Sequence, residues 1–313
     1  MTVNNSTNNS TDCSWFSPEL QHWKIIAYAV IGFCCVSGIP ANIAVIVKLS
    51  RHLRGSSISQ RLFFHLALSD LLCLLCLPVG MVILYRPRLP IYLTGEVCQL
   101  VFYVFVFCIN TSLNILVLIS IQRYYQVIHP QKWEKVNRTW QRILLSSVWI
   151  LGGLMALPVL FFLTKVNSNE GNQNDNHCEN QRVSPVLEAI YIGFVVFSHL
   201  VLLSCYLMLV KGVHRKKMSV KKKPRVTRLF IRILFASLIV GFLPLILRVF
   251  YVFASLTESE HLLCLSRKLT FVECFYFLIY CMNPFLYFFS SRHQRRESFR
   301  QKKRFLMPLD DSS

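Results

Sequence analysis

The stretch "LISIQRYYQVIHPQKW", residues 118–133, ends a long apolar run with Gln122 and Arg123 side by side. An arginine is costly inside hydrocarbon, so we expect this one to lie at a membrane edge. Cys98 stands 25 residues earlier, and at about 1.5 Å per helical residue the two lie roughly 37 Å apart. That length crosses a bilayer, so the sequence predicts a transmembrane helix between them.

The composition extends this prediction to the whole chain. Of the 313 residues, 54% are hydrophobic and only 16% are charged, against about 25% charged in a soluble domain. Apolar runs long enough to cross hydrocarbon begin near residues 23, 60, 98, 140, 186, 228 and 269. We expect an all-α membrane protein with an extracellular segment (residues 1–22), a seven-helix transmembrane bundle (23–289), and a cytoplasmic helix and tail (290–313).

The basic residues are concentrated on one side of the predicted bundle. Of 34 lysines and arginines, 26 fall in the first, third and fifth connections and in the tail. Cytoplasmic loops retain such residues, so the N-terminus is expected outside the cell and the protein in the plasma membrane. The basic run "HRKKMSVKKKPR", residues 214–225, is explained by this bias and by anionic lipid, so no nucleic-acid partner is expected.

Four of the 12 cysteines lie on the predicted outer side. An extracellular setting favours disulfides, and four cysteines permit three connectivities. We expect Cys98 to pair with Cys178, which would fold the loop before the fifth crossing over the helix mouth, and Cys13 to pair with Cys264. The other eight cysteines are expected to be small core residues. The N-terminus also carries overlapping glycosylation sequons at Asn4, Asn5, Asn8 and Asn9.

Six of the crossings carry a polar, aromatic or proline feature at comparable depth. These are Asn42, Asp70, Arg123, Trp149, Pro244 and the motif "NPFLY" at residues 283–287. In this order the chain resembles the rhodopsin-like (class A) G-protein-coupled receptors, from Trp23 to about Phe305. The resemblance implies a heterotrimeric G protein as partner, and the aromatic and basic tail is consistent with a short amphipathic eighth helix on the membrane.

The resemblance also implies roles in G-protein coupling. Arg123 is the expected contact of the Gα C-terminal helix, and Tyr206 and Tyr287 support it in the active state. Pro244 is the kink about which the sixth helix swings, although a static kink is the alternative. The expected set is Gln122, Arg123, Tyr124, Tyr206, Phe242, Pro244, Asn283, Pro284 and Tyr287.

Gln122 departs from the family pattern, which usually has Asp or Glu at this position. A carboxylate there would form an ion pair with Arg123, whereas an amide offers only an uncharged hydrogen bond. We therefore predict a less strongly held inactive state and raised basal signalling. Phe242 likewise stands where the family usually has tryptophan, and Gly241 where it usually has cysteine.

No metal site or bound cofactor is expected apart from an allosteric sodium ion. Asp70, Ser112 and Asn283 match part of the family's buried sodium site, while Ile279 and Tyr280 replace polar partners. The alternative is a protonated Asp70 that is hydrogen-bonded within the bundle.

The outer half of the bundle offers a few polar anchors among apolar side chains, as a ligand pocket requires. Arg248 could hold a ligand carboxylate with two hydrogen bonds. The alternatives are an internal pair with Glu273 or an arginine that reaches to the interface. The predicted ligand-binding set is Tyr103, Phe107, Asn110, Thr111, His199, Arg248, Tyr251 and Glu273.

The ligand class follows from resemblance only. The stretches "QRYYQVIHPQKW" and "GIPAN" are most similar to chemoattractant receptors, nearest those for leukotrienes, and imply a lipid-acid ligand with Gi-type output. A peptide chemoattractant receptor and a hydroxycarboxylic-acid or oxoeicosanoid type of receptor are the alternatives. Arrestin is a further expected partner. A transporter or channel lacks support because no inverted repeat is visible, and no motif indicates an enzyme.

Overall fold

The computed structural model describes residues 18–51, 58–85, 95–129, 137–165, 181–183, 185–215, 225–259 and 270–288 except 286, with single residues at 131, 133, 262 and 265. The long helices are α1 (Pro18–Ser50), α2 (Ile58–Tyr85), α3 (Gly95–Ile128), α5 (Arg138–Phe162), α6 (Pro185–Arg215) and α7 (Arg225–Leu256). The last crossing begins as a 3-10 helix, η3 (Thr270–Phe277), and continues as α-helix over residues 278–285.

Each of the six long helices contains an apolar stretch of 20 to 28 residues, enough to cross a membrane. A seventh, shorter apolar helix covers Cys274–Phe285. Large apolar side chains such as Val36 (78% exposed) and Phe197 (63% exposed) face outward from the bundle, which suits a helix surrounded by lipid. The predicted seven-helix membrane fold is confirmed, while the predicted eighth helix lies outside the described residues.

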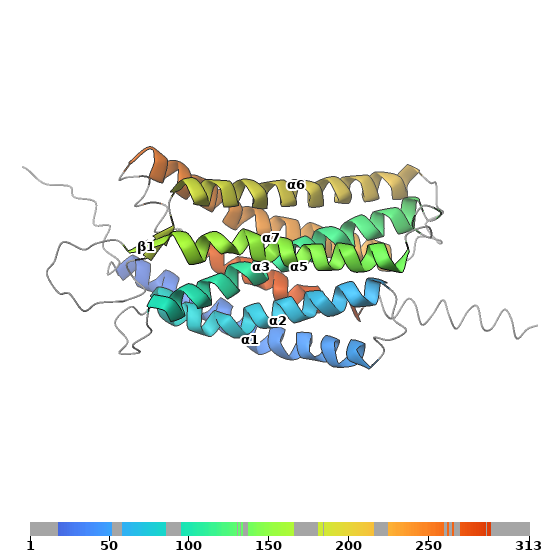
Figure 1. Ribbon diagram of the computed structural model, residues 1–313, viewed down its shortest axis with the longest axis horizontal. Coiled ribbons are helices and arrows are strands. Elements are labelled where there is room, and N and C mark those ends of the chain that lie inside the picture. The colour runs from blue at the N-terminus through green and yellow to red at the C-terminus, as the bar shows by residue number, and fades with distance from the viewer. Residues whose placement is uncertain are drawn as a thin grey trace, which may run out of the picture.

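The helices run up and down along one long axis, with α3 in the interior (Figure 1). Helix α3 packs against α2, α5 and α6, and η3 lies against both α1 and α7, which closes the ring. The described core has three clusters. The first lies around Leu66, Ile115 and Ile119, the second joins α1, α2, α3 and the last crossing around Leu74 and Tyr280, and the third lies between α6 and α7. Every polar residue at the centre of α3 is therefore surrounded by other helices.

A short hairpin was not predicted from the sequence. Strand β1 (Leu163–Lys165) pairs antiparallel with β2 (Gln181–Val183), and Thr164 lies opposite Arg182. Figure 1 shows β1 at the end of the bundle where α1 and α6 begin, which we call the hairpin end. This is the end that the charge pattern predicts to be extracellular.

Candidate functional site

Asp70 is the centre of a buried polar cluster that joins three helices. Its side chain is fully buried in α2. Ser112 of α3 donates a hydrogen bond to Asp70 Oδ1 at 2.7 Å, and Asn283 of the last crossing donates to Asp70 Oδ2 at 2.8 Å. Ser69 Oγ lies 3.0 Å from Ser112 Oγ and donates to the Cys108 carbonyl. Three of the residues predicted for the sodium site are therefore in direct contact.

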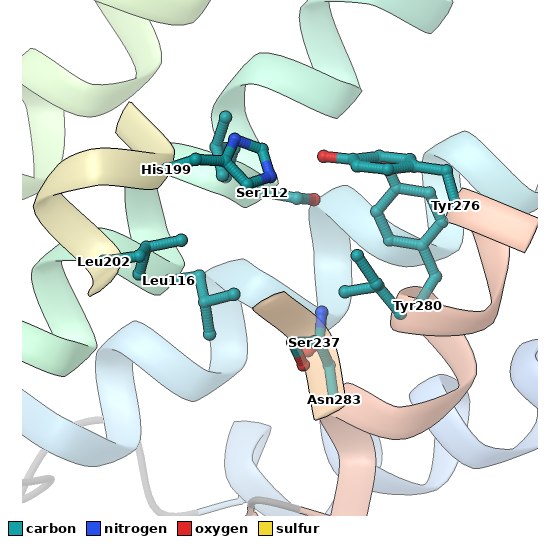
Figure 2. Close-up of a pocket in the computed structure, with 10 residues that line it drawn as sticks. Ser112, Leu116, His199, Leu202, Ser237, Tyr276, Tyr280 and Asn283 are labelled. Atoms are coloured by element: carbon teal, nitrogen blue, oxygen red, sulfur yellow. The ribbon is translucent and has the colours of Figure 1, made fainter. Parts of the chain in front are cut away.

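A cavity beside this cluster is lined by side chains of α3, α6, α7 and the last crossing (Figure 2). Its interior offers about the space that one water molecule needs. Two polar atoms on its wall are buried and have no hydrogen-bond partner: Ser237 Oγ and Asn283 Oδ1. Oxygens of this kind, together with the Asp70 carboxylate and Ser112 Oγ, form a donor set that a hard cation accepts.

Gln122 contacts α2 rather than its neighbour Arg123. The Gln122 side chain is 1% exposed, and its Nε2 donates to Ser59 Oγ at 2.6 Å. The Gln122 Oε1, which a hydrogen bond from Arg123 would require, has no partner. The sequence reasoning recognised the missing carboxylate but did not find Ser59, because no local pattern marks a serine 63 residues away as a partner.

Arg123 lies against an aromatic ring of α2. Its guanidinium carbon is 6.0 Å from the centroid of Phe63, and Nη1 lies 3.4 Å from Gln126 Oε1. The same Phe63 ring packs against the Tyr287 ring in an edge-to-face contact, with centroids 6.0 Å apart. Tyr206 stacks on Phe235 of α7 at 5.8 Å. Phe63 thus lies between Arg123 and one of its two predicted tyrosine partners.

Tyr124, the third residue of the "QRY" sequence, lies among aromatic neighbours. It contacts Tyr125 and His129 with ring centroids 5.4 and 5.9 Å away. The predicted coupling residues Arg123, Tyr124, Tyr206 and Tyr287 all lie near the end of the bundle opposite the hairpin, where α3 and α6 finish.

The proline of the "NPFLY" motif explains a contact between the first and last helices. Pro284 has no N–H, so the carbonyl four residues earlier, that of Tyr280, loses its usual intrahelical donor. Asn42 Nδ2 donates to this carbonyl at 3.1 Å and to the Gly38 carbonyl at 3.0 Å. Two of the aligned features, Asn42 and the Asn-Pro pair, are therefore parts of one structural unit.

Comparison with known proteins agrees with this geometry. Residues 41–287 match the family model described as 7 transmembrane receptor (rhodopsin family). This chain belongs to that family. The predicted membership of the rhodopsin-like receptors is confirmed, and the receptor couples to a G protein in response to an extracellular ligand.

Individual relatives are distant. The receptor is 24% identical to the type-1 angiotensin II receptor of Meleagris gallopavo over 87% of its own length and 79% of the relative's. It is 25% identical to the C5a anaphylatoxin chemotactic receptor 1 of Oncorhynchus mykiss, covering 89% and 83% of the two chains. Leukotriene B4 receptor 1 of Rattus norvegicus is 26% identical over 53% of this receptor and 47% of the relative.

The predicted ligand residues on α3 face different neighbours. Tyr103 and Phe107 stack in parallel with centroids 6.2 Å apart, and Phe107 also contacts Trp149 of α5. Thr111 is fully buried, and its side chain packs against Gly152 of α5. Asn110 is fully buried too, and its Nδ2 donates to the Val106 carbonyl. Each of these residues packs against neighbours within the bundle, and its role in ligand binding stays a prediction.

Arg248 forms an ion pair that the sequence reasoning missed. Its Nη1 lies 3.0 Å from Glu188 Oε1 of α6, and the two side chains are 48% and 17% exposed. The apolar cluster of Ile192, Leu245 and Val252 lies in the same half of α6 and α7, with Tyr191 and Tyr251 packed on it. The Glu273 side chain, which was the predicted internal partner, lies outside the described part of the chain.

Several predictions fall outside the described residues. They concern Cys13, Cys178 and Cys264, the side chain of Cys98, and the sequons at Asn4, Asn5, Asn8 and Asn9. The eight cysteines expected to be core residues are all free thiols that are buried or partly buried.

Proposed function

We propose that this receptor lies in the plasma membrane with its N-terminus outside, is activated by a lipid acid such as a leukotriene or a related eicosanoid, and signals through a Gi-type G protein. The observation that carries the ligand class is the place of Arg248. It is a half-exposed cation in the hairpin half of α7, beside a cluster of apolar side chains from α6 and α7.

Both parts of a lipid acid, its carboxylate and its hydrocarbon chain, match the chemistry of this region. The guanidinium of Arg248 has donors for two parallel hydrogen bonds to a carboxylate. Glu188 now accepts from Nη1, so a ligand carboxylate would share or replace this contact. The hydrocarbon part of the ligand would then lie along apolar side chains near Tyr191 and Tyr251. The similarity to a receptor named for leukotriene B4 supports the same class.

A peptide is the second candidate ligand. The relatives named for angiotensin II and C5a match 87% and 89% of this receptor, whereas the leukotriene relative matches 53%. In this alternative, Arg248 and Glu188 would recognise opposite charges on a peptide, and both residues would be needed.

For the cytoplasmic side, we propose that Arg123 contacts the C-terminal helix of Gα. Its ring neighbour Phe63 links it to Tyr287, and Tyr206 stacks on Phe235. An outward movement of α7 would therefore carry Phe235 away from Tyr206. Arrestin would use the same cytoplasmic end.

We also propose sodium as an allosteric ion, with Asp70, Ser112 and Asn283 as its protein ligands, because the unpartnered Asn283 Oδ1 adds an oxygen beside the carboxylate.

The test is a nucleotide-exchange screen on Gi with purified receptor, using a set of eicosanoids against a set of chemotactic peptides. Arg248→Ala is expected to raise the half-maximal concentration of an active eicosanoid by about tenfold or more, because a charge-assisted bond to a carboxylate contributes about 1.5–3 kcal/mol. Glu188→Gln is expected to leave the response intact or to strengthen it, since it removes a competing carboxylate.

Val249→Ala, at an exposed neighbouring position, is the matched control and should leave the response unchanged. Activation by peptides alone, or an eicosanoid response that Arg248→Ala does not alter, would reject the lipid-acid proposal. Equal losses from Arg248→Ala and Glu188→Gln would favour the peptide candidate.

A further inference from the structure

We propose that His199 is a positioning residue for signalling. Its ring occupies the space that the missing side chain of Gly241 leaves on α7, and this contact sets the position of Phe242. The inference concerns ligand-free coupling to the G protein and does not depend on which ligand the receptor binds.

The His199 ring has a fixed orientation in the interior of the bundle. It is 2% exposed, and its Nδ1 lies 2.9 Å from the Val195 carbonyl, one turn earlier on α6. Since a carbonyl only accepts, Nδ1 donates the proton of this hydrogen bond. This hydrogen bond aims the other edge of the ring at α7.

Gly241 of α7 leaves the space into which this edge of the His199 ring fits. A Cβ at position 241 would lie 2.6 Å from His199 Nε2 and 3.4 Å from its Cδ2. Real contacts of this kind stay beyond about 3 Å, so an alanine would force the ring or α7 to shift. The ring is held by its hydrogen bond to the Val195 carbonyl, so a shift of the ring would distort that bond. His199 and Gly241 therefore fix how closely α6 approaches α7 at this level.

Phe242 transmits this position to both halves of the bundle. Its ring centroid is 5.5 Å from that of His199, with the planes tilted by 58°. Phe242 packs on the core cluster around Leu66, Ile115 and Ile119. It also packs on the apolar cluster of α6 and α7 that contains Ile192 and Leu245. Pro244, the kink residue of α7, follows two positions later. A change in the His199 contact would thus change the rotation of α7 near its kink.

The same ring also borders the polar cluster of Asp70. Figure 2 shows His199 of α6 across the cavity from Tyr276 and Tyr280 of the last crossing, with Ser112 and Asn283 on the wall. Ser112 and Asn283 are the two residues that hydrogen-bond Asp70. His199 therefore touches both Phe242 and the cavity that adjoins the Asp70 cluster, which makes it more than a filler of the α6–α7 interface.

The experiment compares Gly241→Ala, His199→Ala and the double variant in purified full-length receptor. The readouts are ligand-free nucleotide exchange on Gi per mole of folded receptor and the thermal midpoint in detergent. We expect Gly241→Ala to change ligand-free exchange by about threefold or more and to lower the midpoint, because substitutions at residues in direct contact are energetically coupled. In the His199→Ala background the same glycine substitution should have little effect, since the ring it would clash with is gone.

Gly193→Ala on α6, where an added Cβ would meet no atom within 4 Å, is the matched control for the removal of a helical glycine. Equal effects of Gly241→Ala in both backgrounds would overturn the proposal. A lowered midpoint with unchanged exchange would also overturn it, because that result describes packing alone. If Gly241→Ala yields no folded receptor, recovery of folded protein in the double variant supports the contact, and failure of both variants overturns it.

Discussion

Gln122 Nε2 donates a 2.6 Å hydrogen bond to Ser59 Oγ, and this bond ties α3 to α2 directly beside the proposed G-protein contact Arg123. Gln122 and Ser59 are both buried, with 1% and 4% of their surface exposed. A carboxylate at position 122 could accept from Ser59 as well, but it would also place a negative charge next to Arg123. The amide keeps the contact between helices without adding that charge.

Gln122→Asp is therefore expected to lower ligand-free signalling. The new charge would hold Arg123 in its inactive position, and a charge-assisted hydrogen bond of about 1.5–3 kcal/mol corresponds to a reduction of roughly tenfold or more. Ligand-free nucleotide exchange on Gi measures this reduction in signalling. Ser59→Ala is the control, because it removes the bond to α2 and adds no charge; it should cost about 1 kcal/mol of stability without lowering exchange. Unchanged exchange in Gln122→Asp would contradict the prediction.

The Asp70 cluster predicts a stabilising effect of sodium. An ion that binds only the folded receptor raises its stability in proportion to the logarithm of ion concentration. Replacing potassium by sodium at constant ionic strength should raise the thermal midpoint of the receptor by a few degrees. Asp70→Asn should remove this difference, because the neutral amide is a weaker ligand for a hard cation. An equal sodium effect in the variant would place the ion elsewhere.

The paired glycines of α5 give a test of packing between helices. A Cβ on Gly152 would run into Thr111 of α3, whereas a Cβ on Gly153 would meet only ordinary contacts at 3.7–3.9 Å. Alanine raises helix propensity at either position by about 1 kcal/mol. Gly152→Ala is nevertheless expected to lower stability by about 1–3 kcal/mol through overpacking, and Gly153→Ala to leave it unchanged or higher. Detergent unfolding compares the two, and equal midpoints would show that α3 and α5 adjust freely.

The fold could be predicted from sequence because each crossing needs its own apolar run, and such runs are visible one by one. The interior polar residues could also be predicted, since a buried Asp70 or Asn283 is too costly to occur without a partner. The contacts of Ser59, Phe63 and Glu188 could not. Each depends on how a helix is rotated about its axis, and the apolar runs, being hydrophobic on every side, do not specify that rotation.

For the same reason, the sequence could not specify which neighbours the predicted ligand residues contact, and their shared role in ligand binding stays a prediction. Tyr103 and Arg248 were chosen because they lie at similar depth, but depth does not decide which neighbour a side chain faces. Tyr103 lies against Phe107 and near Gly153 of α5, while Arg248 pairs with Glu188 of α6. His199, also predicted as a ligand residue, lines the cavity beside the Asp70 cluster. Its role as a ligand contact stays a prediction.

The contact between Asn42 and the Tyr280 carbonyl predicts a dependence between two positions far apart in the sequence. Asn42→Ala should lower stability by about 1–3 kcal/mol, because it leaves a buried carbonyl without a donor. Pro284→Ala would restore an N–H four residues after Tyr280, so the helix could satisfy this carbonyl by itself. In the Pro284→Ala background the Asn42 substitution should therefore cost less, by about 1 kcal/mol, which thermal unfolding of the four variants measures as a double-mutant cycle. Additive losses would mean that Asn42 acts mainly through its second acceptor, the Gly38 carbonyl within α1, and that the first and last helices are held together by apolar packing instead.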